Sequence, residues 1–229
     1  MKKLLIIALV FVSLFALVAC GETKEPIDLV NEKISLQETK LYTADSEDYF
    51  AELRLVDGED VTALDGKVGE KSVKYIFKLK PKKLDMMNGE YRVTISGDKG
   101  SENIKIEKDV MGMSYSAKLM NIDKAGVPSR LTIVYNDKNF EMELADMMKD
   151  ITCDSKKAVE IAYNELKDAL KDDLSKKEFL REVTVRYINN RKDAASPYYW
   201  YVSMLKSKDD YFAVLIDPKD GKVINKKVL

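Results

Sequence analysis

The chain has 229 residues, of which 45% are hydrophobic and 34% are charged, and this composition is typical of a folded protein with a sizeable core. It excludes a disordered chain and a membrane protein with several spans. Histidine is absent, so the commonest zinc ligand and the usual general base near neutral pH are both missing. The formal net charge of −1 gives no general attraction to nucleic acid, and we expect no nucleic-acid partner.

Two lysines and a long apolar run at the beginning of the chain are typical of a secretory signal peptide. The run covers residues 4–19, which is shorter than the roughly 20 residues that span a bilayer. It ends in Leu17-Val18-Ala19-Cys20-Gly21, which resembles the lipobox of bacterial lipoproteins. This resemblance implies that residues 1–19 are removed and that the Cys20 thiol receives a diacylglycerol group.

A lipidated Cys20 would hold the chain at the outer face of the cell membrane, because each buried methylene of an acyl chain contributes about 0.8 kcal/mol. We therefore predict a membrane-anchored, extracytoplasmic lipoprotein in which residues 20–26 form the lipidated cysteine and its tether. An uncleaved anchor and cleavage at another position are the alternatives. With Cys20 acylated, Cys153 is the remaining thiol, so we expect no internal disulfide.

The predicted fold class is α+β, and residues 27–150 are predicted to form its first domain, a helix followed by an antiparallel sheet. Apolar residues spaced by three, four and seven, from Ile27 through Val30 and Ile34 to Leu41, predict a helix over 26–40. After it the period changes to two, which indicates half-buried strands. These strands are expected over 73–79, 91–95, 104–106, 113–119, 131–135 and 140–144.

One face of such a sheet is apolar and must be covered by the helix, by a second sheet or by a ligand. The segment Gly126–Tyr135 and the hairpin that follows it, with the turn Asn136-Asp137-Lys138-Asn139, resemble the half-barrel lipoprotein carriers. The resemblance implies that a lipid or another hydrophobic ligand occupies the concave face. A half-barrel and a sandwich both remain open for this domain.

Residues 151–229 are predicted to form a second, smaller domain. Asp154 or Ser155 can cap a helix whose Val159, Ala162 and Leu166 lie on one face. Four strands and a turn at Asp217-Pro218-Lys219-Asp220-Gly221 complete this domain. The strands are expected over 182–188, 198–205, 211–216 and 222–228.

This second segment resembles the PepSY domain, an extracytoplasmic module built from one helix on an antiparallel sheet. The matching residues are Ser155–Ala162 at the helix start, Trp200-Tyr201-Val202 on a strand, and Tyr211–Ile224 at the end of the chain. The resemblance implies that this part binds or regulates an envelope or secreted protein, such as a protease.

No pattern in the sequence indicates catalysis, and we predict a protein that is not an enzyme, with no catalytic residue, no metal ligand and no cofactor. Cys153 has no neighbouring base. Ser203 and Lys206 fit a serine–lysine spacing, but on a strand their side chains point to opposite faces. The acidic residues from Asp57 to Asp65 lack the spacing of a calcium loop and are interpreted as a solvated loop.

The aromatic run at 198–201 gives the candidate partner-binding residues. If Trp200 packs on the helix, the alternation of a strand places Tyr199 and Tyr201 on the outward face. Exposed tyrosines on a sheet are typical of protein interfaces. The methionines before residue 149 are interpreted as core residues, with an apolar groove or a Cu(I) site as the alternatives. The lysines over 74–83 are interpreted as a guarded solvent face or edge strand, with contact to anionic lipid or wall polymer as the alternative.

Overall fold

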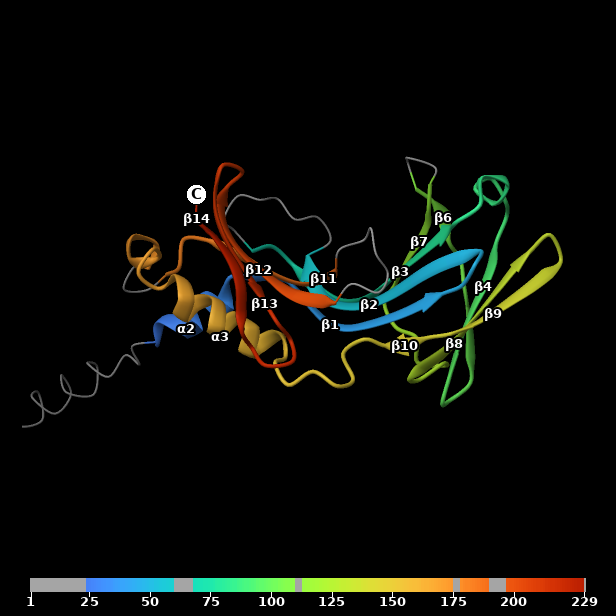
Figure 1. Ribbon diagram of the computed structural model, residues 1–229, viewed down its shortest axis with the longest axis horizontal. Coiled ribbons are helices and arrows are strands. Elements are labelled where there is room, and N and C mark those ends of the chain that lie inside the picture. The colour runs from blue at the N-terminus through green and yellow to red at the C-terminus, as the bar shows by residue number, and fades with distance from the viewer. Residues whose placement is uncertain (1–23, 60–67, 110–112, 175–177, 190–196, 229) are drawn as a thin grey trace, which may run out of the picture.

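The computed structural model describes residues 24–59, 68–109, 113–174, 178–189 and 197–228 (Figure 1). Strands make up 54% of the structure and helical residues 14%, in one large mixed sheet and a second, smaller sheet. The predicted α+β class is therefore wrong, because the protein is mostly β. Cys20 and the predicted signal peptide lie outside the described residues.

The larger sheet has ten strands, nine of which follow the order β14-β13-β12-β11-β1-β2-β3-β7-β6, while β10 pairs with β1. The β1–β11 pair is parallel, and the other pairs are antiparallel. The strands, in chain order, are β1 (Ile34–Asp45), β2 (Tyr49–Glu59), β3 (Lys71–Pro81), β6 (Glu107–Lys108), β7 (Tyr115–Leu119), β10 (Ala145–Asp146), β11 (Glu182–Asn189), β12 (Tyr198–Ser207), β13 (Asp210–Ile216) and β14 (Val223–Val228).

The smaller sheet has four strands in the order β5-β4-β8-β9. They are β4 (Arg92–Gly97), β5 (Ser101–Ile104), β8 (Pro128–Tyr135) and β9 (Lys138–Glu143). The two α-helices of the described part are α2 (Pro26–Glu32) and α3 (Ser155–Leu166), and the two short 3₁₀ helices are η1 (Leu84–Met86) and η2 (Lys171–Asp173). The α-helices lie at one end of the molecule and the smaller sheet at the other (Figure 1).

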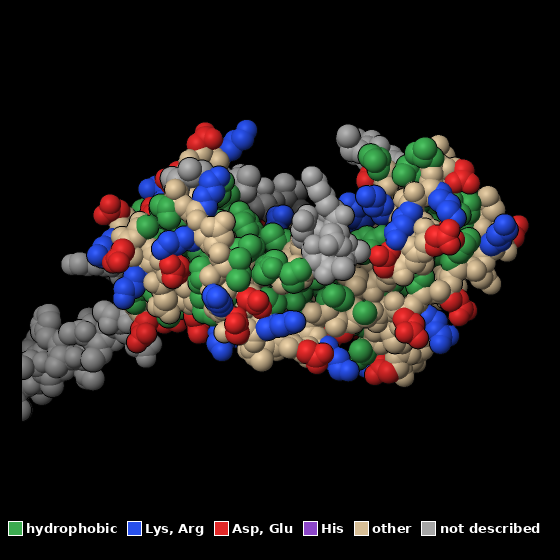
Figure 2. All heavy atoms as spheres, in the orientation of Figure 1, with side chains coloured by type: hydrophobic (Ala, Val, Ile, Leu, Met, Phe, Trp, Pro, Cys, Tyr) green, Lys and Arg blue, Asp and Glu red, His purple; other side chains and the backbone are tan. Residues whose placement is uncertain are grey.

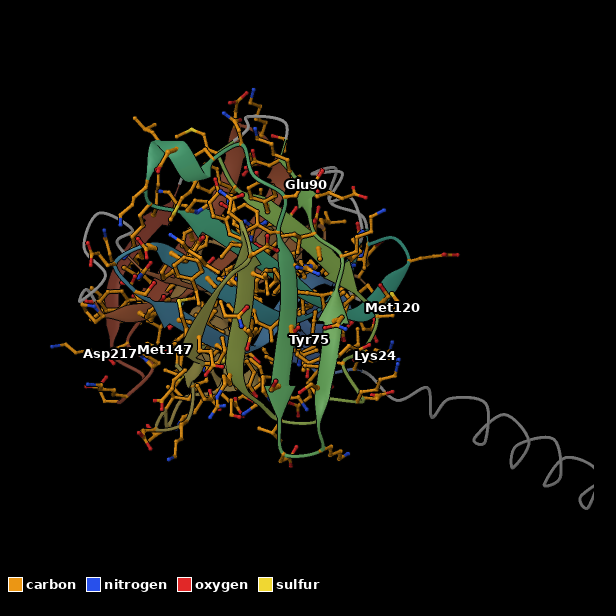
Figure 3. All side chains as sticks on the ribbon, turned by 90° about the vertical axis from the view of Figure 1, so that its right-hand side faces the viewer. Lys24, Tyr75, Glu90, Met120, Met147 and Asp217 are labelled. Atoms are coloured by element: carbon orange, nitrogen blue, oxygen red, sulfur yellow. The ribbon has the colours of Figure 1, made fainter. Side chains whose placement is uncertain are left out.

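Two hydrophobic cores lie along the larger sheet. In the first core α3 packs on β12 and β13, and Val159, Trp200 and Val214 are buried there. In the second core β1, β2 and β3 pack on the smaller sheet, and Leu53 and Ile133 are fully buried between them. Figure 3 looks onto the smaller sheet, with the second core behind it. The long strands β1 to β3 therefore belong to both ends of the molecule.

The two sheets share the second core, as the two sheets of a β-sandwich do. The apolar face of the N-terminal strands is thus covered by side chains of the smaller sheet. Figure 2 shows hydrophobic side chains across the centre of the view and charged side chains over both ends.

The predicted helix over 26–40 is wrong for its second half. Helix α2 ends at Glu32, and β1 begins at Ile34. Ile34 and Leu41, which gave the sequence its helical spacing, are both buried in the first core, but they reach it from a strand. Strand β1 pairs with β2 on one side and with β11 on the other. These pairings with distant segments override the local pattern.

The predicted self-contained helix-on-sheet module is wrong as well. Four antiparallel C-terminal strands do form, and α3 packs on them, but β11 is not an edge strand. The edge of β11 that does not face β12 pairs with β1, where Ile34 lies opposite Val183 and Gln37 opposite Val185. An unpaired edge would leave a row of backbone hydrogen-bonding groups open, and this pairing satisfies them. Strands from both predicted domains therefore lie in one sheet.

Local signals gave correct elements at several places. Helix α3 begins as predicted, and the Asp154 carboxylate accepts a hydrogen bond from the backbone N–H of Lys157 at 2.9 Å. The predicted hairpin is β8–β9, but its turn is only two residues long. Asn136 and Asp137 have φ values of 48° and 58°, as a type I′ turn requires, and β9 begins at Lys138.

Candidate binding face

The face of the large sheet that points away from α3 and the smaller sheet, called here the open face, carries the candidate site. On β12, Trp200 and Val202 are buried against α3, whereas Tyr199 and Tyr201 are half-buried. The Trp200 Nε1–H donates to the backbone oxygen of Cys153 at 2.7 Å, which fixes the indole on the α3 side. Alternation along the strand then places Tyr199 and Tyr201 on the open face.

Three tyrosines, Tyr199, Tyr201 and Tyr211, lie on the open face of β12 and β13, and the surface that they share is called here the tyrosine patch. Strand pairing places Tyr201 between Arg186 of β11 and Leu215 of β13. Burial and the nearby Tyr211 raise the pKa of Tyr201, while Arg186 and a lysine of β14 act in the opposite direction. Arg186 is therefore the direct cross-strand neighbour of Tyr201, and Tyr211 lies four residues farther along the β12–β13 pair.

The tyrosine patch is bordered by a lysine on its outer side. The Lys227 ammonium lies 5.0 Å from the centre of the Tyr211 ring and donates to the Tyr211 hydroxyl at 2.7 Å. Lys226, which precedes Lys227 on β14, faces the opposite way and pairs with Glu165 of α3 at 2.7 Å. The two neighbouring lysines thus confirm which side of β14 belongs to the open face.

A pocket of about 230 Å³ adjoins the patch on the open face, where β11 lies beside β1 to β3. Arg186 lines this pocket and also lies opposite Tyr201, so the pocket and the patch are continuous. The lining residues are Glu38, Glu52, Arg54, Ile76, Lys78, Arg186, Ile188 and Asn189.

A buried ion-pair network forms one side of the pocket. Arg54 Nη1 donates to Glu38 Oε2 at 2.6 Å, and Arg54 Nη2 donates to Glu52 Oε1 at 2.9 Å. The side chains of these three residues are only 12%, 9% and 6% exposed, respectively. Charge-assisted hydrogen bonds of this kind hold the carboxylates and the guanidinium in fixed positions.

The same network joins β11 to β1 and β2 where regular pairing stops. The backbone N–H of Tyr187 donates to Glu38 Oε2 at 2.9 Å, and the Tyr187 carbonyl accepts from Arg54 Nη1 at 2.9 Å. The register of β1 shifts just after Glu38. Two side chains therefore satisfy backbone groups of β11 that a straight neighbouring strand would otherwise satisfy.

Two cations of the pocket are not part of this network. Lys78 and Arg186 are both exposed. No ion pair among the described residues includes Lys78 or Arg186, although Glu52 lies opposite Lys78 in the β2–β3 register. Ile76 of β3 also lines the pocket and lies opposite Arg54 in the β2–β3 register.

The remaining candidates from the sequence do not form a reactive site. Cys153 is fully buried, and burial raises the pKa of its thiol. The Ser203 hydroxyl hydrogen-bonds to Thr184 at 2.6 Å, whereas Lys206 pairs with Asp173 at 3.1 Å, so the predicted separation of this serine and lysine is correct.

The acidic cluster is not a loop over its described part, because Asp57 and Glu59 lie within β2; Asp60 and Asp65 fall outside the described residues. No group of three or more potential metal ligands occurs in the parts of the chain that the structure describes. Methionines divide between the core, with Met142 and Met148 buried, and the surface, where Met120 is 65% exposed.

For the lysine-rich strand the edge position is wrong, whereas the exposed Lys78 and Lys80 agree with the alternative of a solvent face. Strand β3 lies between β2 and β7, and Lys74 is buried, with its Nζ donating to the carbonyl of Gly58 at 2.8 Å. The sequence also gave no indication of the Arg54 network, since a charged residue between apolar neighbours on a strand usually faces water.

Comparison with known proteins found no matching family model, no similar curated protein and no similar solved structure. Among the residues that the structure describes, no helix has both the length and the hydrophobicity needed to cross a bilayer.

Proposed function

We propose that the protein is a membrane-anchored, extracytoplasmic lipoprotein that binds an envelope or secreted protein through the tyrosine patch and is not an enzyme. The lipobox-like residues around Cys20 support the anchor and the location. The segments that resemble the PepSY domain support a protein partner. Both inferences come from the sequence, and the geometry of the open face supplies the proposed contact surface.

The observation that carries the proposal is the tyrosine patch itself. Tyrosine and arginine are enriched among the residues that dominate protein–protein affinity. Here Tyr201 lies between Arg186 and Leu215 on a sheet face, with Tyr199 on the same strand. An accessible sheet face of this kind can contact another protein over an area much larger than a small-molecule pocket offers.

The segments with PepSY resemblance also meet in space, which supports treating them as one unit of recognition. The Pro218 carbonyl in the terminal turn accepts hydrogen bonds from the backbone N–H groups of Thr152 and Cys153, at 3.1 and 3.0 Å. The Trp200 indole N–H donates a hydrogen bond to the Cys153 carbonyl. The turn, the start of α3 and strand β12 are thereby held together behind the tyrosine patch.

A hydrophobic ligand in the N-terminal sheet was the alternative function. The apolar face expected to hold it packs on the smaller sheet through residues such as Phe77 and Ile95. This alternative stays a prediction, and the described residues provide no observation that favours it over protein binding.

Photo-crosslinking in intact cells tests the proposal. A photoreactive amino acid replaces Tyr199 in one strain and Glu160, on the exposed side of α3, in a second strain. We expect a discrete crosslinked protein with the first and none with the second. In chains carrying the probe at Tyr199, the additional change Tyr201→Ala should weaken that product. Equal products from both positions, or none at Tyr199, would contradict a partner surface at the tyrosine patch.

A further inference from the structure

The charge of the pocket beside the tyrosine patch is not balanced by its own residues. Glu38 and Glu52 share one guanidinium, that of Arg54, which leaves one negative charge in the network. Lys78 and Arg186 then add two positive charges at the exposed side. The lining residues that the structure describes have a net charge of +1, which one singly charged anion would neutralise.

The shape and lining of the pocket favour an anion on a short apolar stem. Ile76 and Ile188 provide hydrocarbon walls, and the Asn189 amide provides a further hydrogen-bonding group. The Arg186 guanidinium can bind both oxygens of a carboxylate at once, and the Lys78 ammonium can act as a point charge beside it. A short side chain with one or two methylene groups and a single negative charge, such as that of aspartate or glutamate, can contact both the isoleucines and the two cations.

A phosphate group fits this pocket less well. The Glu38 and Glu52 carboxylates are fixed in its wall by Arg54 and cannot turn away. A phosphate with close to two negative charges would exceed the net charge of +1 of the described lining, whereas a carboxylate with one negative charge matches it.

We propose that the pocket receives an acidic side chain of the protein partner, and that this contact sets the orientation of the partner on the tyrosine patch. The inference rests on the proposed function, since it concerns the same partner. Arg186 lines the pocket and lies opposite Tyr201, so a single segment of the partner can reach both. Charged contacts beside an aromatic centre commonly determine specificity and registration.

A binding measurement on the purified full chain in detergent tests the pocket directly. The probe is N-acetylglutamate N-methylamide, and the isosteric glutamine derivative serves as the neutral comparison. At low ionic strength we expect saturable binding of the glutamate probe, with binding of the glutamine derivative at least tenfold weaker. Chemical shifts of the Arg186 side chain should move with the glutamate probe.

Charge-removing variants assign the binding to the pocket. The double variant Lys78→Gln/Arg186→Gln should bind the glutamate probe at least tenfold more weakly than the unmodified chain. The matched control Lys156→Gln/Lys157→Gln removes two exposed positive charges from α3 and should leave binding unchanged. Thermal unfolding of both variants should match that of the unmodified chain, because all four side chains are exposed.

Three results would overturn the inference: equal binding of the two derivatives, equal loss in both double variants, or tighter binding of inorganic phosphate than of the glutamate probe. The last result would point to a phosphate-bearing polymer as the occupant. Crosslinking at Tyr199 is measured separately. Crosslinking without probe binding rejects the pocket alone, whereas probe binding without crosslinking rejects the proposed function.

Discussion

Replacement of Arg54 by methionine should destabilise the protein more than any change of a single exposed charge. The guanidinium is the partner of two nearly buried carboxylates, those of Glu38 and Glu52. Methionine has a similar length and no charge, so the variant keeps much of the packing and removes the ion pairs. Both carboxylates would then remain in the sheet without their cation.

The expected loss follows from this burial. Breaking a buried ion pair by removing one partner costs about 3–5 kcal/mol, because the remaining charge is left uncompensated. The loss of the hydrogen bond from Arg54 to the Tyr187 carbonyl adds to this cost. For a typical free energy of unfolding of about 5–15 kcal/mol, Arg54→Met alone removes a large fraction of the stability.

Urea unfolding, followed by tryptophan fluorescence from Trp200, measures the effect. The control is the triple variant Glu38→Gln/Glu52→Gln/Arg54→Met, in which the network carries no charge. We expect it to recover most of the loss and to lie within about 2 kcal/mol of the unmodified chain. A triple variant as unstable as Arg54→Met, or a cost below about 1 kcal/mol for Arg54→Met, would refute the role assigned to the network.

Three further predictions concern single residues. Labelled palmitate should enter the unmodified protein and not the Cys20→Ala variant, and equal labelling would reject the lipid anchor. Cys153 should react with a thiol reagent at pH 8 only after unfolding, because it is fully buried and burial raises its pKa; rapid reaction of the native protein would show that the thiol is accessible. Gly97→Ala should lower stability by about 3 kcal/mol in urea unfolding, since the new Cβ would lie 2.1 Å from the Val127 oxygen and 2.4 Å from that of Ala125; an unchanged midpoint would contradict this packing.

The elements that the sequence predicts correctly are those decided by neighbouring residues. The cap of α3 depends on Asp154 and the N–H three residues later. The terminal turn depends on the short segment from Asp217 to Gly221, in which Gly221 has a φ of 75° and its N–H donates to the Asp217 carbonyl at 2.9 Å. Strand β3 follows from the alternation around Phe77.

The features that the sequence does not reveal depend on contacts between distant segments. The predicted fold class is wrong in part because the residues after Glu32 form a strand that pairs with β11, and no local sequence pattern indicates that pairing. The Arg54 network is of the same kind. Its carboxylate Glu38 lies 16 residues from Arg54, and the Tyr187 carbonyl lies 133 residues away from Arg54. The tyrosine patch could be partly predicted, because Tyr199 and Tyr201 alternate with Trp200. Its third tyrosine, Tyr211, and the neighbouring Arg186 come from other strands and could not be predicted.

The parallel pairing of β1 with β11 has a consequence for the order in which the molecule can be assembled. The Tyr187 N–H and the Glu38 carboxylate that binds it are separated by 149 residues. The central strand of the large sheet therefore lacks one neighbour until most of the polypeptide is present, and contacts of such long range slow folding. Completion of the sheet therefore waits for the last third of the sequence, and under the proposed extracytoplasmic location this step would follow passage of the chain across the membrane.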